Sequence, residues 1–187
     1  MSDLPNFFSW MTQARGITVK GGPGSGRYPK GSGEGDEDRG AAETVDRFVM
    51  SSQADRNTMV HKGEIKTDVG GGVTGNFYGV GNKIVAQDTW GTDHAEGVLN
   101  KHNALDSRYV IGRSMHVING RPYLVSEKLD RAETVFDVGK LPKGLQSYIS
   151  DFESRGGGVG EGKFTYGYDK GGSAKLIDVS EWRLPRK

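Results

Sequence analysis

The chain has 187 residues, with 25 Lys and Arg against 24 Asp and Glu, so its formal net charge of +1 favours neither nucleic acid nor an acidic surface as a partner. It contains no cysteine, which excludes disulfides, thiolate metal sites and a cysteine nucleophile. No apolar run approaches the roughly 20 residues that cross a bilayer, and no signal-peptide pattern opens the chain, so we expect no membrane partner and synthesis in a cytoplasm.

The first 40 residues are predicted to form an arm. Residues 4–14 suit a short helix whose large apolar side chains need a surface to pack on, either the chain's own domain or a different subunit. These side chains belong to Phe7, Phe8, Trp10 and Met11. Residues 20–35 are rich in glycine and carry little apolar surface, so they predict an extended or flexible linker.

The wording of this linker, GGPGSGRYPKGSG over residues 21–33, resembles a Gly-rich segment of minor head and head-morphogenesis proteins of tailed bacteriophages. The resemblance covers only the linker. It implies a virion protein, made in the host cytoplasm, that takes part in capsid assembly in an oligomeric context and binds other virion subunits. Arg27 and Tyr28 would then join the apolar residues of the short helix as partner-binding residues.

The remainder, residues 41–187, is predicted to form a single α+β domain. Apolar side chains spaced by three and four predict helices over residues 41–53, 92–105 and 144–154, the second capped by Thr92. Alternating and β-rich segments predict strands over residues 64–69, 76–80, 83–87, 109–118, 123–129, 163–168 and 174–179.

Two further local signals complete this prediction. The dipeptide Asn119-Gly120 predicts a two-residue hairpin turn, and the polar residues 51–62 predict a connection between the first helix and the first strand. The expected architecture is therefore a mainly antiparallel sheet with a packed helix, behind an extended Gly-rich arm over residues 1–40.

A glycine loop is the first candidate for a ligand site. Gly70, Gly72 and Gly75 satisfy G-x-G-x-x-G, a pattern whose backbone N–H groups can approach a phosphate closely. A dinucleotide-binding motif must open a helix, but here strand-forming Phe77 and Tyr78 follow. A strand, a glycine loop and a returning strand are instead the arrangement of a protein-kinase glycine loop. The alternative is a hairpin tip without a ligand.

From Ile65 to Leu129 the order of parts resembles a protein-kinase small lobe: a glycine hairpin, a third strand, a helix and two more strands. Residues 175–180, Lys-Leu-Ile-Asp-Val-Ser, likewise resemble the segment that carries a kinase's metal-binding aspartate. The resemblance implies ATP and magnesium as cofactors. It also implies that Asp178 would be the catalytic Mg²⁺ ligand and that Glu96 would orient a lysine.

Other residues depart from the kinase pattern. Aligning Val85-Ala86-Gln87 with the third strand puts Asp88 where the lysine belongs. Lys83 precedes Asp88 by five positions, so the two side chains should lie on opposite faces of the strand. No H-R-D-type loop precedes Asp178. We therefore predict no catalytic residue, metal or cofactor.

Two remaining motifs carry little chemistry. His94-Ala95-Glu96 matches the H-x-E of zinc deaminases, but that reaction needs paired cysteines, which the chain lacks. The basic residues 183–187 could contact a phosphate backbone, although such a segment is more often a frayed tail.

Three functions remain open on the sequence. The first is a structural or accessory component of a tailed-phage particle. The second is a small kinase-like nucleotide-binding phage protein, and the third is an unrelated host regulatory domain.

Overall fold

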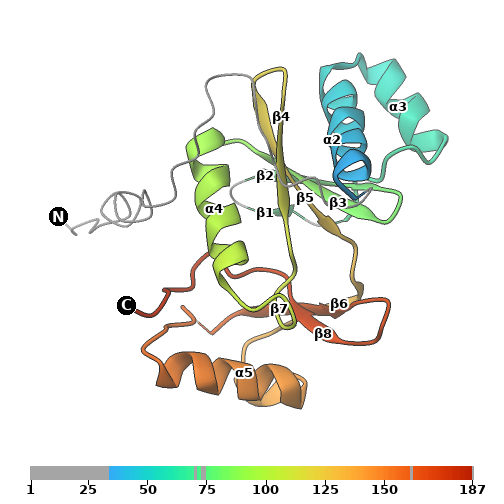
Figure 1. Cartoon of the computed structure of the whole chain (residues 1–187). Helices are drawn as coiled ribbons and strands as arrows, with labels where there is room; N and C mark the ends of the chain where they lie inside the picture. The colour runs from blue at the N-terminus through green and yellow to red at the C-terminus, as the bar shows by residue number, and fades with distance from the viewer. Residues whose placement is uncertain (1–33, 70, 73–74, 161, 187) are drawn as a thin grey trace. The chain divides into compact units, whose positions relative to one another are not determined.

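Two antiparallel sheets form the framework of the described residues, which are 34–69, 71–72, 75–160 and 162–186 of this computed structural model (Figure 1). The larger sheet contains β1 (Gly71–Gly72), β2 (Gly75–Val80), β3 (Lys83–Asp88), β4 (Ser114–Ile118) and β5 (Arg121–Glu127), in the order β1-β2-β3-β5-β4. The smaller sheet contains β6 (Asp130–Val135), β7 (Phe164–Tyr168) and β8 (Ala174–Leu176), in that order. With the helices below, this confirms the predicted α+β class and the mainly antiparallel pairing.

Each face of the larger sheet packs against a helix. Because side chains alternate along a strand, neighbouring residues of β3 belong to different hydrophobic clusters. Val85 packs with Val45 of α2 (Glu34–Met50), whereas Ala86 packs with Ala95 of α4 (Thr92–Ala104). Figure 1 shows the two helices on either side of the strands. The sheet is therefore the middle layer, and each of its faces can carry a separate site.

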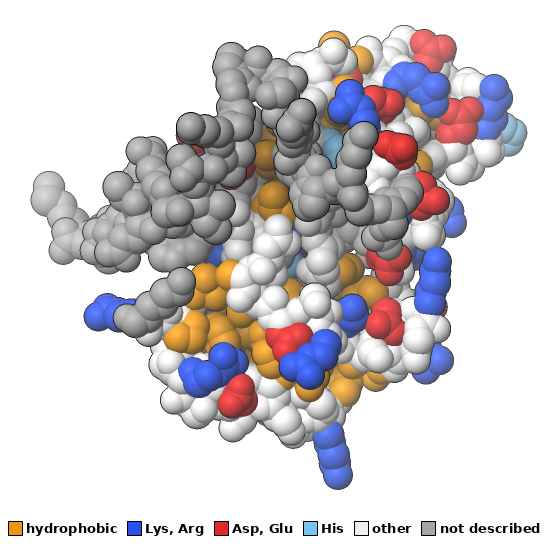
Figure 2. Space-filling view, viewed as in Figure 1, with side chains coloured by type: hydrophobic (Ala, Val, Ile, Leu, Met, Phe, Trp, Pro, Cys, Tyr) orange, Lys and Arg blue, Asp and Glu red, His pale blue; other side chains and the backbone are white. Residues whose placement is uncertain are grey.

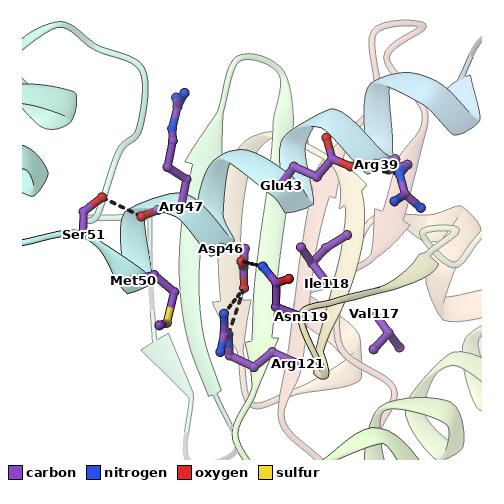
Figure 3. A pocket seen from close by; sticks show the side chains of 10 residues that line it. All are labelled: Arg39, Glu43, Asp46, Arg47, Met50, Ser51, Val117, Ile118, Asn119 and Arg121. Atoms are coloured by element: carbon purple, nitrogen blue, oxygen red, sulfur yellow. Dashed lines mark hydrogen bonds and ion pairs between the residues drawn. The ribbon is translucent and has the colours of Figure 1, made fainter.

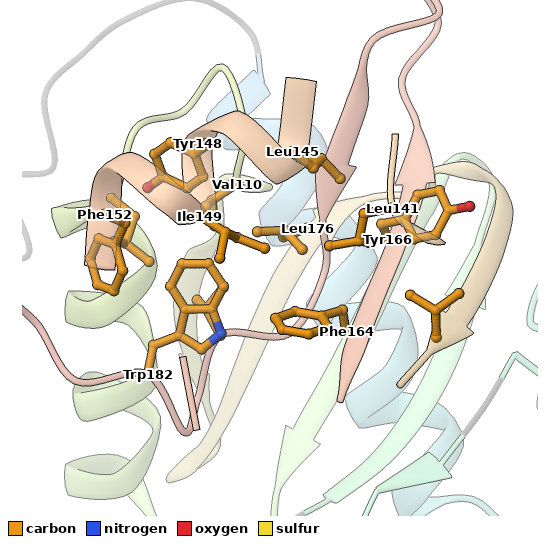
Figure 4. Packing of buried hydrophobic residues seen from close by; sticks show 13 residues of the cluster. Val110, Leu141, Leu145, Tyr148, Ile149, Phe152, Phe164, Tyr166, Leu176 and Trp182 are labelled. Carbon is orange, nitrogen blue, oxygen red and sulfur yellow. The ribbon is translucent and has the colours of Figure 1, made fainter. Parts of the chain in front are cut away.

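The smaller sheet packs against α5 (Lys143–Ser154). The predicted amphipathic stripe of this helix is buried and consists of Leu145, Tyr148, Ile149 and Phe152. Figure 4 shows these side chains together with Phe164, Leu176 and Trp182, which belong to the same cluster. The aromatic rings of Phe152 and Trp182 lie 5.0 Å apart, so the segment after β8 is held against the helix.

Two predictions about the helices near the arm were wrong. The first helix begins at Glu34 rather than at residue 41, so residues 34–40 of the predicted arm are helical. Its first turns carry Asp36, Glu37 and Asp38, whose charges suit the positive end of a helix dipole. The predicted connection over residues 51–62 contains a further helix, α3 (Gln53–His61), in which only Met59 is buried. A single buried residue leaves no apolar periodicity to detect.

Three other predicted boundaries also differ. Residues 64–69 do not form a strand but make one bridge, between Lys66 and Gly79. Residues 109–113, predicted as the start of a strand, are irregular apart from a bridge between Val110 and Leu176. The residue that caps α4 is Gly91, not Thr92, and no side-chain hydrogen bond closes this helix end.

The hairpin prediction was confirmed. Asn119 and Gly120 join β4 to β5 with φ angles of 50° and 78°, the left-handed conformation that a two-residue turn of this type requires. Asp36–Lys187 forms one compact unit. The predicted partner-binding residues of the arm, from Phe7 to Tyr28, lie outside the described residues. Among the described helices, none is long and apolar enough to cross a membrane.

Candidate functional site

The glycine segment differs from the prediction, because the strand expected over residues 64–69 is absent and Gly71–Gly72 of the segment itself forms the short strand β1, which pairs with β2. Gly72 pairs with Gly75 between these two strands, and Gly75 also pairs with Asp88 on the neighbouring strand. A Cβ atom on Gly75 would lie 2.3 Å from the backbone oxygen of Gln87, a distance that no side chain tolerates. Close packing between strands therefore accounts for Gly75 without any ligand. Gly70 lies outside the described residues.

Asp88, which the resemblance to a kinase would align with a lysine, faces α4. Its side chain is only 4% exposed, and its carboxylate accepts a hydrogen bond from the Trp90 backbone N–H at 2.8 Å. The other carboxylate oxygen lies 2.5 Å from Nδ1 of His94, in the first turn of α4. The Trp90 ring lies 4.9 Å from the His94 ring and is 62% exposed. This position therefore carries a carboxylate–imidazole pair beside an exposed indole.

Lys83 lies on the opposite face of β3, as the spacing of five positions predicted. It is buried, and its Nζ lies 2.7 Å from Oδ1 of Asp38 on α2. The other oxygen of Asp38 accepts a hydrogen bond from Ser114 Oγ at 2.7 Å, and that hydroxyl lies 3.1 Å from Nε2 of His116. Burial lowers the pKa of Lys83, but hydrogen bonding to Asp38 and its charge outweigh burial and raise the pKa overall. Lys83 therefore attaches α2 to the sheet.

Glu96, the residue that would orient a lysine, points to solvent. Its neighbours Ala95 and Gly97 are buried, so the turn of α4 directs Glu96 outward. To the described residues Glu96 makes no hydrogen bond or ion pair. The structure therefore does not bring Glu96 together with Lys83 or with Asp178.

Asp178 follows β8 and is held within its own turn. Its carboxylate accepts hydrogen bonds from the backbone N–H of Ser180 at 3.0 Å and from the Ser180 hydroxyl at 2.7 Å. Desolvation raises the pKa of Asp178, but these hydrogen bonds and the charge of Arg113 lower it overall. Arg113 donates to the backbone oxygen of Ile177 at 2.9 Å. Asp178 is thus the anionic partner of a cluster that attaches the C-terminal segment.

The same cluster includes two residues at the end of α4. Lys101 donates a hydrogen bond to the backbone oxygen of Ser180. His102 is 3% exposed, and its Nδ1 lies 3.1 Å from the backbone oxygen of Ile111. Burial and the Arg113 charge lower the pKa of His102 to about 3, so the imidazole is neutral at neutral pH. These contacts are structural and leave Asp178 surrounded by cationic groups.

Sequence reasoning missed a second buried carboxylate, Asp46 on α2. It accepts hydrogen bonds from the side chains of Asn119, Arg121 and Tyr123 at 2.8, 2.8 and 2.7 Å. An open hollow of about 790 Å³ lies beside it, between α2 and the β4–β5 turn (Figure 3). The spacing of Asp46 in the sequence could have identified it as a buried residue. It follows Ala42 by four residues and so lies on the apolar stripe of the helix.

Comparison with protein-family models, with curated proteins and with solved structures returns no match to this chain. Within the described ranges, no group of three or more His, Cys, Asp or Glu side chains is arranged to hold a metal ion. Figure 2 shows basic and acidic side chains interspersed over the described part of the visible face. The residues considered as a phosphotransfer site therefore lie in separate clusters.

Proposed function

We propose that the chain is a structural or accessory component of a tailed-phage particle and that its folded unit acts without catalysis. The observation that carries the non-catalytic part of this proposal is the position of Lys83. Phosphoryl transfer needs a lysine on the phosphates and a carboxylate on Mg²⁺ in one site. Here Lys83 is paired with Asp38 on the α2 face of the sheet, whereas Asp88 and His94 lie on the α4 face.

The arrangement of polar residues supports a scaffold. Lys83 and Asp38 hold α2 to the larger sheet, and Lys101 and Arg113 bind backbone oxygens of the segment after β8. Lys83 thus serves to connect elements of the fold, and Asp178 is bound by Ser180 within its own turn. The phage assignment itself is supported by the linker wording over residues 21–33, with the arm as the segment that binds neighbouring virion subunits.

A second candidate is the small kinase-like nucleotide-binding protein. One observation favours it: the strand order β1-β2-β3-β5-β4, with α4 between β3 and β4 along the chain, keeps the sequence of parts that resembles a kinase small lobe. The β7–β8 hairpin also leads directly to Asp178. This candidate predicts ATP and Mg²⁺ binding, and the first candidate does not require it.

The arm can be tested during infection. We would replace residues 21–33 with a shuffled sequence of the same composition and follow the chain through a density gradient of the assembled particles. The proposal predicts that the natural chain sediments with particles and that the shuffled arm reduces its association several-fold. As a matched control, Phe136→Ser on the folded unit, an exposed residue distant from the arm in sequence, should leave association unchanged. Equal association of the natural and shuffled chains would contradict this role of the arm.

A further inference from the structure

The segment around Trp90 presents an exposed indole that is held in place. The Trp90 backbone N–H is bound by buried Asp88, and its ring rests against the His94 ring at an interplanar angle of 58°. Exposed tryptophan side chains that are ordered before binding lose little entropy on association, and tryptophan is enriched among residues that dominate binding energy. Trp90 therefore has the properties of a preorganised contact.

His94 is oriented by the same carboxylate. Asp88 is a buried acceptor next to Nδ1, so Nδ1 donates to Asp88. Nε2, on the other side of the ring, makes no hydrogen bond to any described residue. The His94 side chain is 23% exposed, which leaves its outer edge open to a donor from solvent or from a ligand.

The charged residues near Trp90 in the sequence are acidic. Between Ile84 and Asn100 the sequence contains Asp88, Asp93 and Glu96 but no Lys or Arg. Asp93 and Glu96 are exposed in the first turns of α4, close in sequence to Trp90 and His94. The carboxylates of Asp93 and Glu96 carry two full charges, which exceed the roughly half positive charge of the start of α4. A cation brought to the Trp90 ring would thus meet net favourable charge as well as the negative face of the indole.

We infer that Trp90, His94 and the acidic start of α4 form a binding site for an arginine side chain of a partner protein. The guanidinium group would stack on the Trp90 ring, donate an N–H to Nε2 of His94, and be balanced by Asp93 and Glu96. Arginine fits better than lysine because its planar group stacks on aromatic faces while still donating hydrogen bonds. This inference rests on the proposed function in one respect, which is that the partner protein would be a neighbouring subunit.

The test uses the isotope-labelled full chain and the small probe Nα-acetyl-arginine amide, with the neutral citrulline analogue as a matched ligand. Nuclear magnetic resonance would follow the Trp90 indole and the His94 ring during each titration. We expect saturable shifts at both residues with the arginine probe, and at least five-fold weaker binding of the citrulline probe. Equal binding of the two probes, or no shift at Trp90 with either, would overturn the inference.

Variants locate the site. Trp90→Leu should abolish the shifts at His94, whereas Phe136→Leu, which changes another exposed aromatic residue, should not. Asp93→Asn with Glu96→Gln changes exposed side chains only and should weaken binding by about two- to five-fold while the spectrum stays native. Unchanged binding in both Trp90→Leu and the double variant would contradict the site. The titration needs no particle, so failure to bind arginine and absence from particles are separate results.

Discussion

The hydroxyl of Tyr123, in the middle of β5, donates a 2.7 Å hydrogen bond to the carboxylate of Asp46 on α2. Both residues are buried, with exposed fractions of 0% and 4%. Burial alone raises the pKa of Asp46, but the hydrogen bonds from Tyr123, Asn119 and Arg121 outweigh it and lower the pKa below 3.8. The same pairing and burial raise the pKa of Tyr123 to about 12. α2 is thus attached by a charged network as well as by apolar packing.

Replacing Asp46 should weaken this attachment. Asp46→Asn keeps the shape of the side chain but leaves Arg121 without its counter-charge, and we expect a loss of about 2–4 kcal/mol in the free energy of unfolding. Urea denaturation at pH 7 measures this loss. Glu43→Gln, which removes an exposed ion pair with Arg39 on the same helix, should cost less than about 1 kcal/mol. Similar losses in the two variants would contradict the importance of burial at Asp46.

The pH dependence of the stability of Asp46→Asn provides a second test of the role of Asp46. The folded-state pKa of Asp46 lies below its ordinary value of 3.8. The carboxylate therefore contributes its full stabilisation above pH 3.8 and loses it as the pH falls through the lowered pKa. The difference in unfolding free energy between the natural chain and Asp46→Asn should shrink as the pH drops below 3.8. A difference that stays constant to pH 2 would be inconsistent with an ionised Asp46.

His102 should make the fold sensitive to mild acid. Its folded-state pKa of about 3 lies below the ordinary 6.5, so the unfolded chain binds the proton more readily. The stability contribution is complete above pH 6.5 and decreases as the pH falls from 6.5 towards 3. Between pH 7.5 and 5 this should cost roughly 2 kcal/mol. His102→Asn keeps a donor for the Ile111 oxygen but cannot take up a proton, so its stability should vary less with pH.

The matched control for His102 is His61, an exposed residue at the end of α3. Urea denaturation across the same pH range should give His61→Asn the same pH dependence as the natural chain. If His102→Asn also retained that dependence, the acid sensitivity would have to arise from another group.

The glycine hairpin should depend on Gly75 for packing. Gly75→Ala places a methyl group against the Gln87 backbone oxygen, which must move, and we expect a loss of about 1–3 kcal/mol. Gly112→Ala is the control, because a methyl group there meets nothing within 4 Å. Thermal unfolding followed by circular dichroism compares the two variants. A melting temperature unchanged in Gly75→Ala would contradict the strand register of β2 and β3.

Phosphoryl transfer should not occur. Incubation of the full chain with labelled ATP, Mg²⁺ and generic acceptor proteins should give no transfer above a protein-free blank, because Lys83, Glu96 and Asp178 occupy separate places. Weak nucleotide binding without transfer would be compatible with a structural role. Transfer that disappeared in Asp178→Ala, with the fold intact, would reject it in favour of the kinase-like candidate.

Much of the architecture could be predicted from local sequence pattern. α5, the Asn119-Gly120 turn and the opposite orientations of Lys83 and Asp88 all follow from spacing within a few residues. The partners of those residues could not be predicted. Asp46 reaches Tyr123 across 77 positions, and Ser114 reaches Asp38 across 76. Contacts of this kind depend on how helices are placed on the sheet. The helix α3 could not be predicted either, because its single buried residue gives no apolar periodicity.

We propose that the chain is a structural or accessory part of a phage particle. The most direct test is quantitative mass spectrometry of gradient-purified particles, with an isotope-labelled copy of the chain as the standard. The account predicts a fixed number of copies per particle, the same in independent preparations and retained after salt washing. Absence from particles while the chain is abundant in the infected-cell lysate would contradict it.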